Sequence, residues 1–334
     1  MTVSNPAAVI WYAVLFISIA AYLLGDGFDL GTGLLYSFIK KEENKRLTLR
    51  AISPFWDGNE VWLIIIFGGL LAGFPNVYGL ILSIFYTPIW ELVLGLIFRG
   101  IAIEVRNHSA RFAWRLIWDL LFSFSSLLIT FIMGTLLGNL MAGISLNISS
   151  THTFFRAYPS LIGLLSVFVC ALQGGTYLCM KAEHLYNSLR QPIRISLVCF
   201  GSLYIISFFS AFIYLPEIFL NFFNFPLLFV FPLLNIILYV MLVRSFFKNA
   251  YGKAFLYSCL NICCLTVTVG CLIFPYLLRF TDGMESLTLF NSAVDAKTLN
   301  VLLIMLAIGL PFVIGYNIFI YRLFRNKITD SEHY

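Results

Sequence analysis

Long apolar runs alternate with short polar segments along the whole chain. Runs of roughly 20 apolar residues have the length that an α-helix needs to cross a bilayer. Because lipid offers no hydrogen-bond partner to the backbone, each run is expected to be a helix. The predicted spans cover residues 8–38, 54–74, 77–100, 117–138, 160–180, 194–215, 225–243, 255–278 and 299–321. The pattern predicts an all-α polytopic membrane protein, a bundle of nine transmembrane helices in which residues 1–334 form a single transmembrane domain.

The composition supports a membrane location. Of the 334 residues, 60% are hydrophobic and only 11% are charged, whereas soluble domains carry about 25% charged residues. A chain this apolar could not keep its surface in water, which excludes a soluble enzyme or binding module. The sequence also has no basic patch of the kind that binds nucleic acid.

The basic residues are distributed unequally between the two sides of the predicted bundle. Eighteen of the 21 Lys and Arg residues follow the odd-numbered spans, in segments such as Lys40–Arg50 and Lys181–Pro192, which are expected to be loops. The other three are Arg156, Arg279 and Lys297. Short cytoplasmic loops of membrane proteins are enriched in Lys and Arg. The asymmetry therefore predicts a periplasmic N-terminus and a cytoplasmic C-terminus.

Acidic residues inside the first two predicted spans are the first candidates for chemistry. Asp26 and Asp29 lie in the first span, and Asp57 and Glu60 lie in the second. Each pair has i, i+3 spacing, which puts both side chains on one face of a helix. Ionisable groups at membrane depth are costly and usually face a bundle interior or a water path.

The third predicted span adds a cation and two further acids. Arg99 and Glu104 lie toward its cytoplasmic end, near the level of the other four acids, and Glu91 lies deeper. Buried carboxylates beside an arginine can exchange protons near neutral pH. The cluster therefore suits a proton-entry path from the cytoplasm. The spacing alone equally allows acids that only form ion pairs at the membrane surface.

Histidine and cysteine give no sign of a metal site. The histidines, which usually hold haem iron inside a bundle, all lie outside the predicted spans; they are His108, His152, His184 and His333. The seven cysteines lie inside apolar runs and form no C-x-x-C motif, as expected of buried apolar side chains. We expect no metal ligand and no covalently bound cofactor in this chain.

Trp56 and Arg99 are the candidates for contact with a haem or a quinone. Both lie close to the acids in the predicted topology. Ordinary packing between helices is the alternative for Trp56, because aromatic residues are frequent along this chain.

Two acidic motifs occur in the first two predicted spans. They are Gly25-Asp26-Gly27-Phe28-Asp29-Leu30-Gly31 and Trp56-Asp57-Gly58-Asn59-Glu60-Val61-Trp62-Leu63. Phe98-Arg99-Gly100, Glu104-Val105-Arg106 and Gln173-Gly174-Gly175 follow in order. Together they resemble subunit II of cytochrome bd-type quinol oxidases, and the resemblance covers nearly the whole chain. The cyanide-insensitive branch of that family shares the same motifs.

The resemblance implies a place in the bacterial respiratory chain. Subunit II is expected to form a heterodimer in the bacterial cytoplasmic (inner) membrane with subunit I, a homologous nine-helix chain. Subunit I would hold haem b and haem d and bind quinol, and the complex would oxidise quinol and reduce oxygen to water. A structural quinone and small single-span accessory subunits are compatible with the family.

The resemblance also implies roles for individual acids. The carboxylates that match Asp26, Asp57 and Glu104 are expected to form a proton path toward the haems of subunit I. Asp29 and Glu60 are secondary candidates for the same path. Some relatives have Asp at the position of Glu104, which preserves the carboxylate, whereas Glu91 matches no signature residue.

Two other functions fit part of the pattern. Intramembrane carboxylates also drive proton-coupled membrane transporters, but those tend to have inverted repeats and helices broken near the midplane. No repeat is visible in this sequence. In the second alternative, the chain is a purely structural assembly subunit of the oxidase and the acids serve only folding.

Fusions to alkaline phosphatase test the predicted topology. This enzyme is active only when it is exported, so a fusion after Lys327 should be inactive and a fusion near Ser150 should be active. Phosphatase activity per amount of fusion protein reports the result. The reverse pattern would contradict the nine-span topology.

Overall fold

The fold is known for residues 5–145 and 154–327 from a computed structural model. His152, His333 and Ser150, which entered the sequence analysis, lie outside the described residues. Helices overlap all nine predicted spans. The chain is therefore an all-α polytopic membrane protein, as predicted.

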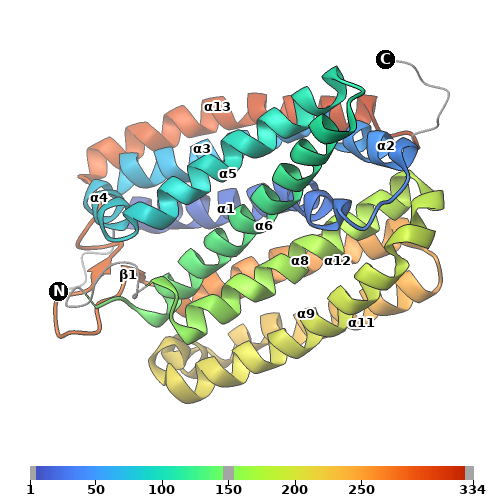
Figure 1. The fold of residues 1–334 in the computed structure, drawn as a ribbon. Helices are drawn as coiled ribbons and strands as arrows, with labels where there is room; N and C mark the ends of the chain where they lie inside the picture. The colour runs from blue at the N-terminus through green and yellow to red at the C-terminus, as the bar shows by residue number, and fades with distance from the viewer. Residues whose placement is uncertain (1–4, 146–153, 328–334) are drawn as a thin grey trace.

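The first half of the chain runs back and forth along the bundle. Its helices are α1 (Pro6–Tyr36), α2 (Glu42–Ile52), α3 (Trp56–Gly73), α4 (Pro75–Ile84), α5 (Tyr86–Val105), η1 (Arg106–His108) and α6 (Phe112–Ala142). In Figure 1, α2 lies at one end of the bundle, and α4 lies at the other.

The second half adds further long helices and a small hairpin. The elements are α8 (Ala157–Lys181), η2 (Glu183–Leu185), α9 (Tyr186–Tyr214), η3 (Pro216–Phe219), α10 (Leu220–Asn224), η4 (Pro226–Phe229), α11 (Val230–Phe247), α12 (Tyr251–Ile273), β1 (Tyr276–Leu278), β2 (Leu287–Thr288) and α13 (Ala296–Leu323). The strands β1 and β2 pair antiparallel.

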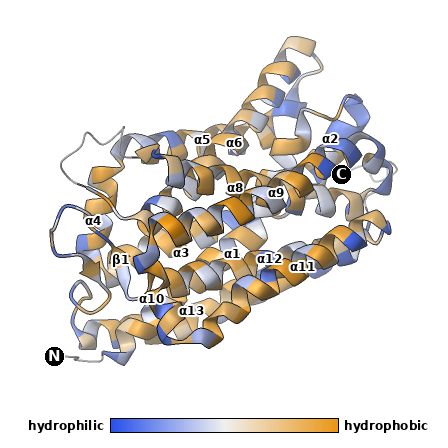
Figure 2. Ribbon diagram, turned by 90° about the horizontal axis from the view of Figure 1, so that it is seen from below, coloured by the Kyte–Doolittle hydropathy of each residue, from blue (hydrophilic) through white to orange (hydrophobic). Residues whose placement is uncertain are grey.

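The number of membrane crossings depends on how bent helices are counted. In the part of the chain that the structure describes, seven helices are long and apolar enough to cross, or up to nine if each of two bent pairs is one span. Hydrophobic residues follow the lengths of the helices in Figure 2, and hydrophilic residues gather at α2 and at the ends of the bundle. The orientation of the two ends stays a prediction.

Residues Lys40–Arg50 are not a loop, contrary to the prediction. Most of them form α2, which places Glu42 and Glu43 in its first turn and buries Leu47 and Leu49. Acidic side chains stabilise a helix N-terminus. The helix is short and rich in charge, so its apolar face does not stand out in the sequence.

The third predicted span, residues 77–100, is not one straight helix. The chain bends by 89° between α4 and the helical segment that follows it. Phe85, which is fully buried, stands at the junction. Pro88 lies in the first turn of α5, where proline is tolerated because the first N–H groups have no partner within the helix. The bend leaves α5 as a separate 20-residue helix that carries Arg99 and Glu104.

Two predicted boundaries are also wrong. The span 255–278 ends as a helix at Ile273, because Pro275 cannot continue a helix and disfavours helical backbone in the residue before it. Residues 276–278 form β1 instead. Conversely, α9 begins at Tyr186 rather than near 194 and contains Pro192.

The helix α1 lies at the centre of the bundle, where it packs against α3, α6, α8, α12 and α13. Its closest approach is to α8. A Cβ added to Gly31 would lie 1.8 Å from the carbonyl oxygen of Cys170, and one added to Gly174 would lie 2.3 Å from the carbonyl carbon of Gly31. Small residues allow membrane helices to approach in this way.

Alanine at either glycine should destabilise the bundle. The obstructing atoms belong to the backbone, so the helices themselves must move apart, and overpacking of this kind costs about 1–3 kcal/mol or more. Gly31→Ala and Gly174→Ala should therefore lower the thermal unfolding temperature of the purified protein in detergent. Gly79→Ala is the matched control, because nothing lies within 4 Å of an added Cβ there. Equal unfolding temperatures for all three variants would contradict the close α1–α8 contact.

Candidate functional site

The centre of the candidate site is Arg99 of α5, whose side chain is fully buried. Its two terminal nitrogens donate to both carboxylate oxygens of Asp26 on α1, at 2.8 and 2.7 Å. One of them also donates to Glu60 of α3 at 2.6 Å. Asp26 is fully buried and the Glu60 side chain is 25% exposed. One guanidinium thus joins three helices through two carboxylates.

A second polar contact lies on the same pair of helices. The side-chain amide of Asn59 on α3 donates to Asp29 of α1 at 2.8 Å, and the hydroxyl of Tyr321 on α13 donates to the Asn59 carbonyl oxygen at 3.1 Å. Gly25 makes room for this contact, because a Cβ there would lie 2.7 Å from the same oxygen. Asn59 was not among the residues singled out from the sequence, although it lies between Asp57 and Glu60.

The predicted acids therefore fall into two groups. Asp26, Asp29 and Glu60 come together with Arg99 around the interior faces of α1 and α3. Asp57, at the start of α3, and Glu104, at the end of α5, are exposed on the surface of the chain. Neither has a hydrogen bond or an ion pair with any described residue.

Trp56 lies beside this site but packs on the protein itself. The side chain is partly buried, and a Cβ added to Gly100 of α5 would come within 3.3 Å of its ring. Arg99 has both terminal nitrogens engaged by carboxylates. Of the two candidates for contact with a cofactor, Trp56 is the more accessible.

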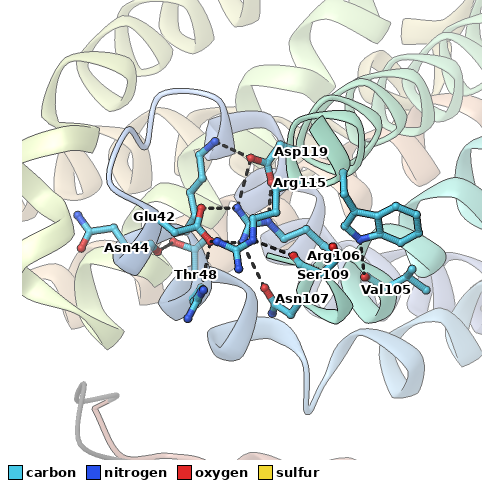
Figure 3. A network of polar contacts seen from close by, with 12 residues as sticks. Glu42, Asn44, Thr48, Val105, Arg106, Asn107, Ser109, Arg115 and Asp119 are labelled. Carbon is cyan, nitrogen blue, oxygen red and sulfur yellow. Dashed lines mark hydrogen bonds and ion pairs between the residues drawn. The ribbon is translucent and has the colours of Figure 1, made fainter. Parts of the chain in front are cut away.

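A second ionic network fastens the end of α5 to its neighbours (Figure 3). Arg106, which is 1% exposed, donates to Asp119 of α6 at 2.7 Å and to both oxygens of Glu42 on α2 at 2.8 and 2.9 Å. Asp119 also accepts from Lys45 at 2.6 Å, and Glu42 forms an ion pair with Arg115 at 2.9 Å. The network fixes the end of α5 only two residues beyond Glu104.

Sequence reasoning missed Glu42 and Asp119. Glu42 lies outside the predicted span 54–74, and the hydrogen bonds from Arg106 hold the pKa of its carboxyl low, at about 2. Asp119 could have been found from the sequence, because it is an acid inside the predicted span 117–138. Its partners come from α2 and η1, which no local pattern links to α6.

The family model for cytochrome bd terminal oxidase subunit II matches residues 7–324 of this chain. This chain belongs to the cytochrome bd oxidase subunit II family. It is accordingly one member of a terminal oxidase complex that includes a partner subunit I. The resemblance seen in the sequence motifs is confirmed.

Relatives of the subunit II family cover the chain almost end to end. Cytochrome bd-I ubiquinol oxidase subunit 2 of Escherichia coli strain K12 is 26% identical over 97% of this chain and 95% of its own length. Cytochrome bd ubiquinol oxidase subunit 2 of Bacillus subtilis is 27% identical over 97% of both chains. The fold is similar to that of a chain in the bd oxidase structure from Geobacillus thermodenitrificans, with a TM-score of 0.78, 20% identity and coverage of 96% and 98% of the two chains.

Removing the central arginine should destabilise this subunit II. Arg99→Ala would leave Asp26 buried without its cation, and breaking a buried pair in this way costs about 3–5 kcal/mol. The yield of assembled complex and its unfolding temperature should both fall. Arg46→Ala is the control, because the Arg46–Glu42 pair is largely exposed and such pairs contribute about 1 kcal/mol or less. Equal yields for the two variants would contradict the central role of Arg99.

Proposed function

We propose that this chain is the haem-free subunit II of a quinol:oxygen oxidoreductase in the bacterial cytoplasmic membrane. In this role it supports subunit I and takes up protons for the electrogenic reduction of oxygen to water. The observation that carries the proposal is the series of carboxylates from the exposed Asp57 and Glu104 to the buried pair of Asp26 and Arg99.

Haem b and haem d belong to subunit I in this proposal. Among the described residues, the histidines are His108 in η1 and His184 in η2, both exposed and outside the long helices. A haem inside a bundle is usually held by a histidine at membrane depth, and neither described histidine occupies such a position. A structural quinone would contact Trp56 rather than the enclosed Arg99.

The proton path begins at the exposed acids. Asp57 precedes Glu60 by one helical turn, about 4.5 Å of rise, and Glu104 lies about 7.5 Å beyond Arg99 along α5. Glu60 is the bridging group, since it is partly exposed and also bound to Arg99. A proton that reaches Glu60 neutralises its carboxylate and weakens its hydrogen bond to Arg99. Arg99 is then still paired with the Asp26 carboxylate.

The exposed carboxylates also indicate where subunit I docks. Asp57 and Glu104 lie on α3 and α5, next to the partly exposed Glu60. A carboxylate at membrane depth avoids lipid and faces protein or water. We infer that subunit I covers the part of this face around Glu60, and that the path continues from Glu60 into that subunit. Small accessory subunits stay compatible with the remaining surface.

The two alternative functions differ in their support. A proton-coupled transporter is disfavoured, because the chain belongs to an oxidase family and the acids gather at one end of the bundle. In the structural alternative the chain is still subunit II of the oxidase, but the Arg99 cluster serves only assembly and carries no protons. Amide substitutions separate proton transfer from assembly, because an amide keeps the shape and much of the hydrogen bonding of a carboxyl group.

Amides at the exposed acids should reduce turnover and spare assembly. In Asp57→Asn and Glu104→Gln the side chain no longer binds and releases a proton, so quinol-driven oxygen consumption should fall about tenfold or more. Haem content and yield of the complex should stay near those of the wild type. Oxygen uptake per haem d in purified complexes measures the effect.

Glu43→Gln is the matched control for these amides. Glu43 is an exposed acid of α2 without an ion pair among the described residues, so turnover should be unchanged. Full turnover in both Asp57→Asn and Glu104→Gln would rule out the proton path. Loss of haem together with turnover would support the structural alternative.

A further inference from the structure

An apolar groove runs along the outside of the bundle between α6 and α9. Both helices pack on α8, whose Phe168 and Ala171 form the floor. One wall comes from α6, with Leu120 and Phe124, and the other from α9, with Ile195. The groove encloses about 1000 Å³, part of it open to the surroundings. It is separate from the face of α3 and α5 that carries Asp57 and Glu104.

The open side of the groove faces the hydrocarbon of the membrane. Phe124 is 61% exposed and Ile195 is 51% exposed, and both belong to helices that are long and apolar enough to cross the bilayer. Water is not available at that depth to fill the space. A flexible hydrocarbon chain matches both the apolar lining and the open side.

The groove is polar, with basic residues close by, where α1 ends. Ser37 at the end of α1 donates to Ser123 of α6 at 2.8 Å, and both side chains line the groove. Phe38, also in the lining, is followed closely by Lys40 and Lys41. Both lysines are exposed, and neither has an ion pair with a described residue.

Two cations near this end of the groove are already bound to protein carboxylates. Lys45 is bound to Asp119, and Arg115 is bound to Glu42. Arg194, next to Ile195, lies over the ring of Phe247. Lys40 and Lys41 are exposed and have no carboxylate partner among the described residues, so they can attract an anion. Lysines near a membrane surface attract acidic headgroups.

We propose that this groove binds an anionic phospholipid. One acyl chain lies between α6 and α9 over Phe168 and Ala171. The phosphate is held at the basic end by Lys40 and Lys41, with the hydroxyl groups of Ser37 and Ser123 beside the glycerol. Charge selects the lipid, and the shape of the groove holds its chain.

Lipid retention by the purified complex tests the proposal. The complex is exchanged into detergent, washed, supplied with equal amounts of phosphatidylglycerol and phosphatidylcholine, and measured by native mass spectrometry. The wild type should retain phosphatidylglycerol selectively. The double variant Lys40→Gln/Lys41→Gln should bind it about tenfold or more weakly. Lys248→Gln/Lys253→Gln is the matched control, because it removes the same charge from exposed positions at the end of α11 and the start of α12 and should not change retention.

A second pair of variants tests the groove independently of charge. Ile195→Trp fills the groove and should reduce retention, whereas Ile206→Trp changes a residue of the same helix and the same exposure that does not line it. Equal retention in Lys40→Gln/Lys41→Gln and its control, or in the two tryptophan variants, would overturn the proposal. A bound polypeptide mass in place of lipid would also overturn it and would indicate an accessory helix. Because lipid is counted without turnover, the result is independent of the proton path.

Discussion

A buried arginine that requires a carboxylate governs the arrangement of this bundle. An isolated guanidinium at the position of Arg99 would cost several kcal/mol, so α5 can pack there only if anions reach it from neighbouring helices. Asp26 of α1 and Glu60 of α3 both do so at hydrogen-bond distance. Because each carboxylate occupies one position on its helix, the contact fixes the rotation of α1 and α3 about their own axes.

Much of this arrangement could be predicted from the sequence, because its causes are local. The length of the apolar runs sets the spans, and the i, i+3 spacing places Asp26 and Asp29 on one face of a helix. The break at Phe85, the helix α2 and the partner of Asp29 could not be predicted. Each depends on contacts between distant segments: Phe85 is buried by tertiary packing, and Asn59 reaches Asp29 only because Gly25 leaves room.

In the sequence the acids of the two motifs cannot be told apart, whereas in the fold they differ in solvent exposure. Asp26 is enclosed with its cation, Glu60 is partly exposed, and Asp57 is exposed. A group that shares an arginine in a closed interior is held as an ion pair, so in the proposed path a proton reaches Asp26 only through Glu60. A group that reaches the surface can exchange protons with water or with a partner. The gradient of exposure along α3 is thus the physical basis for proposing a direction of proton movement.

The same energetic rule, that no charge is left in hydrocarbon, applies to the two outer faces with different results. On α3 and α5 the unpaired groups are the carboxylates of Asp57 and Glu104, beside the buried cluster. That face is therefore suited to contact with polar protein groups or water rather than with lipid. Between α6 and α9 the lining is apolar and the cations, Lys40 and Lys41, follow the groove only at its end. That pattern suits a molecule with an apolar chain and an anionic head. The proposed docking face of subunit I and the proposed lipid groove are therefore different surfaces, and the two proposals do not require competition between the two partners.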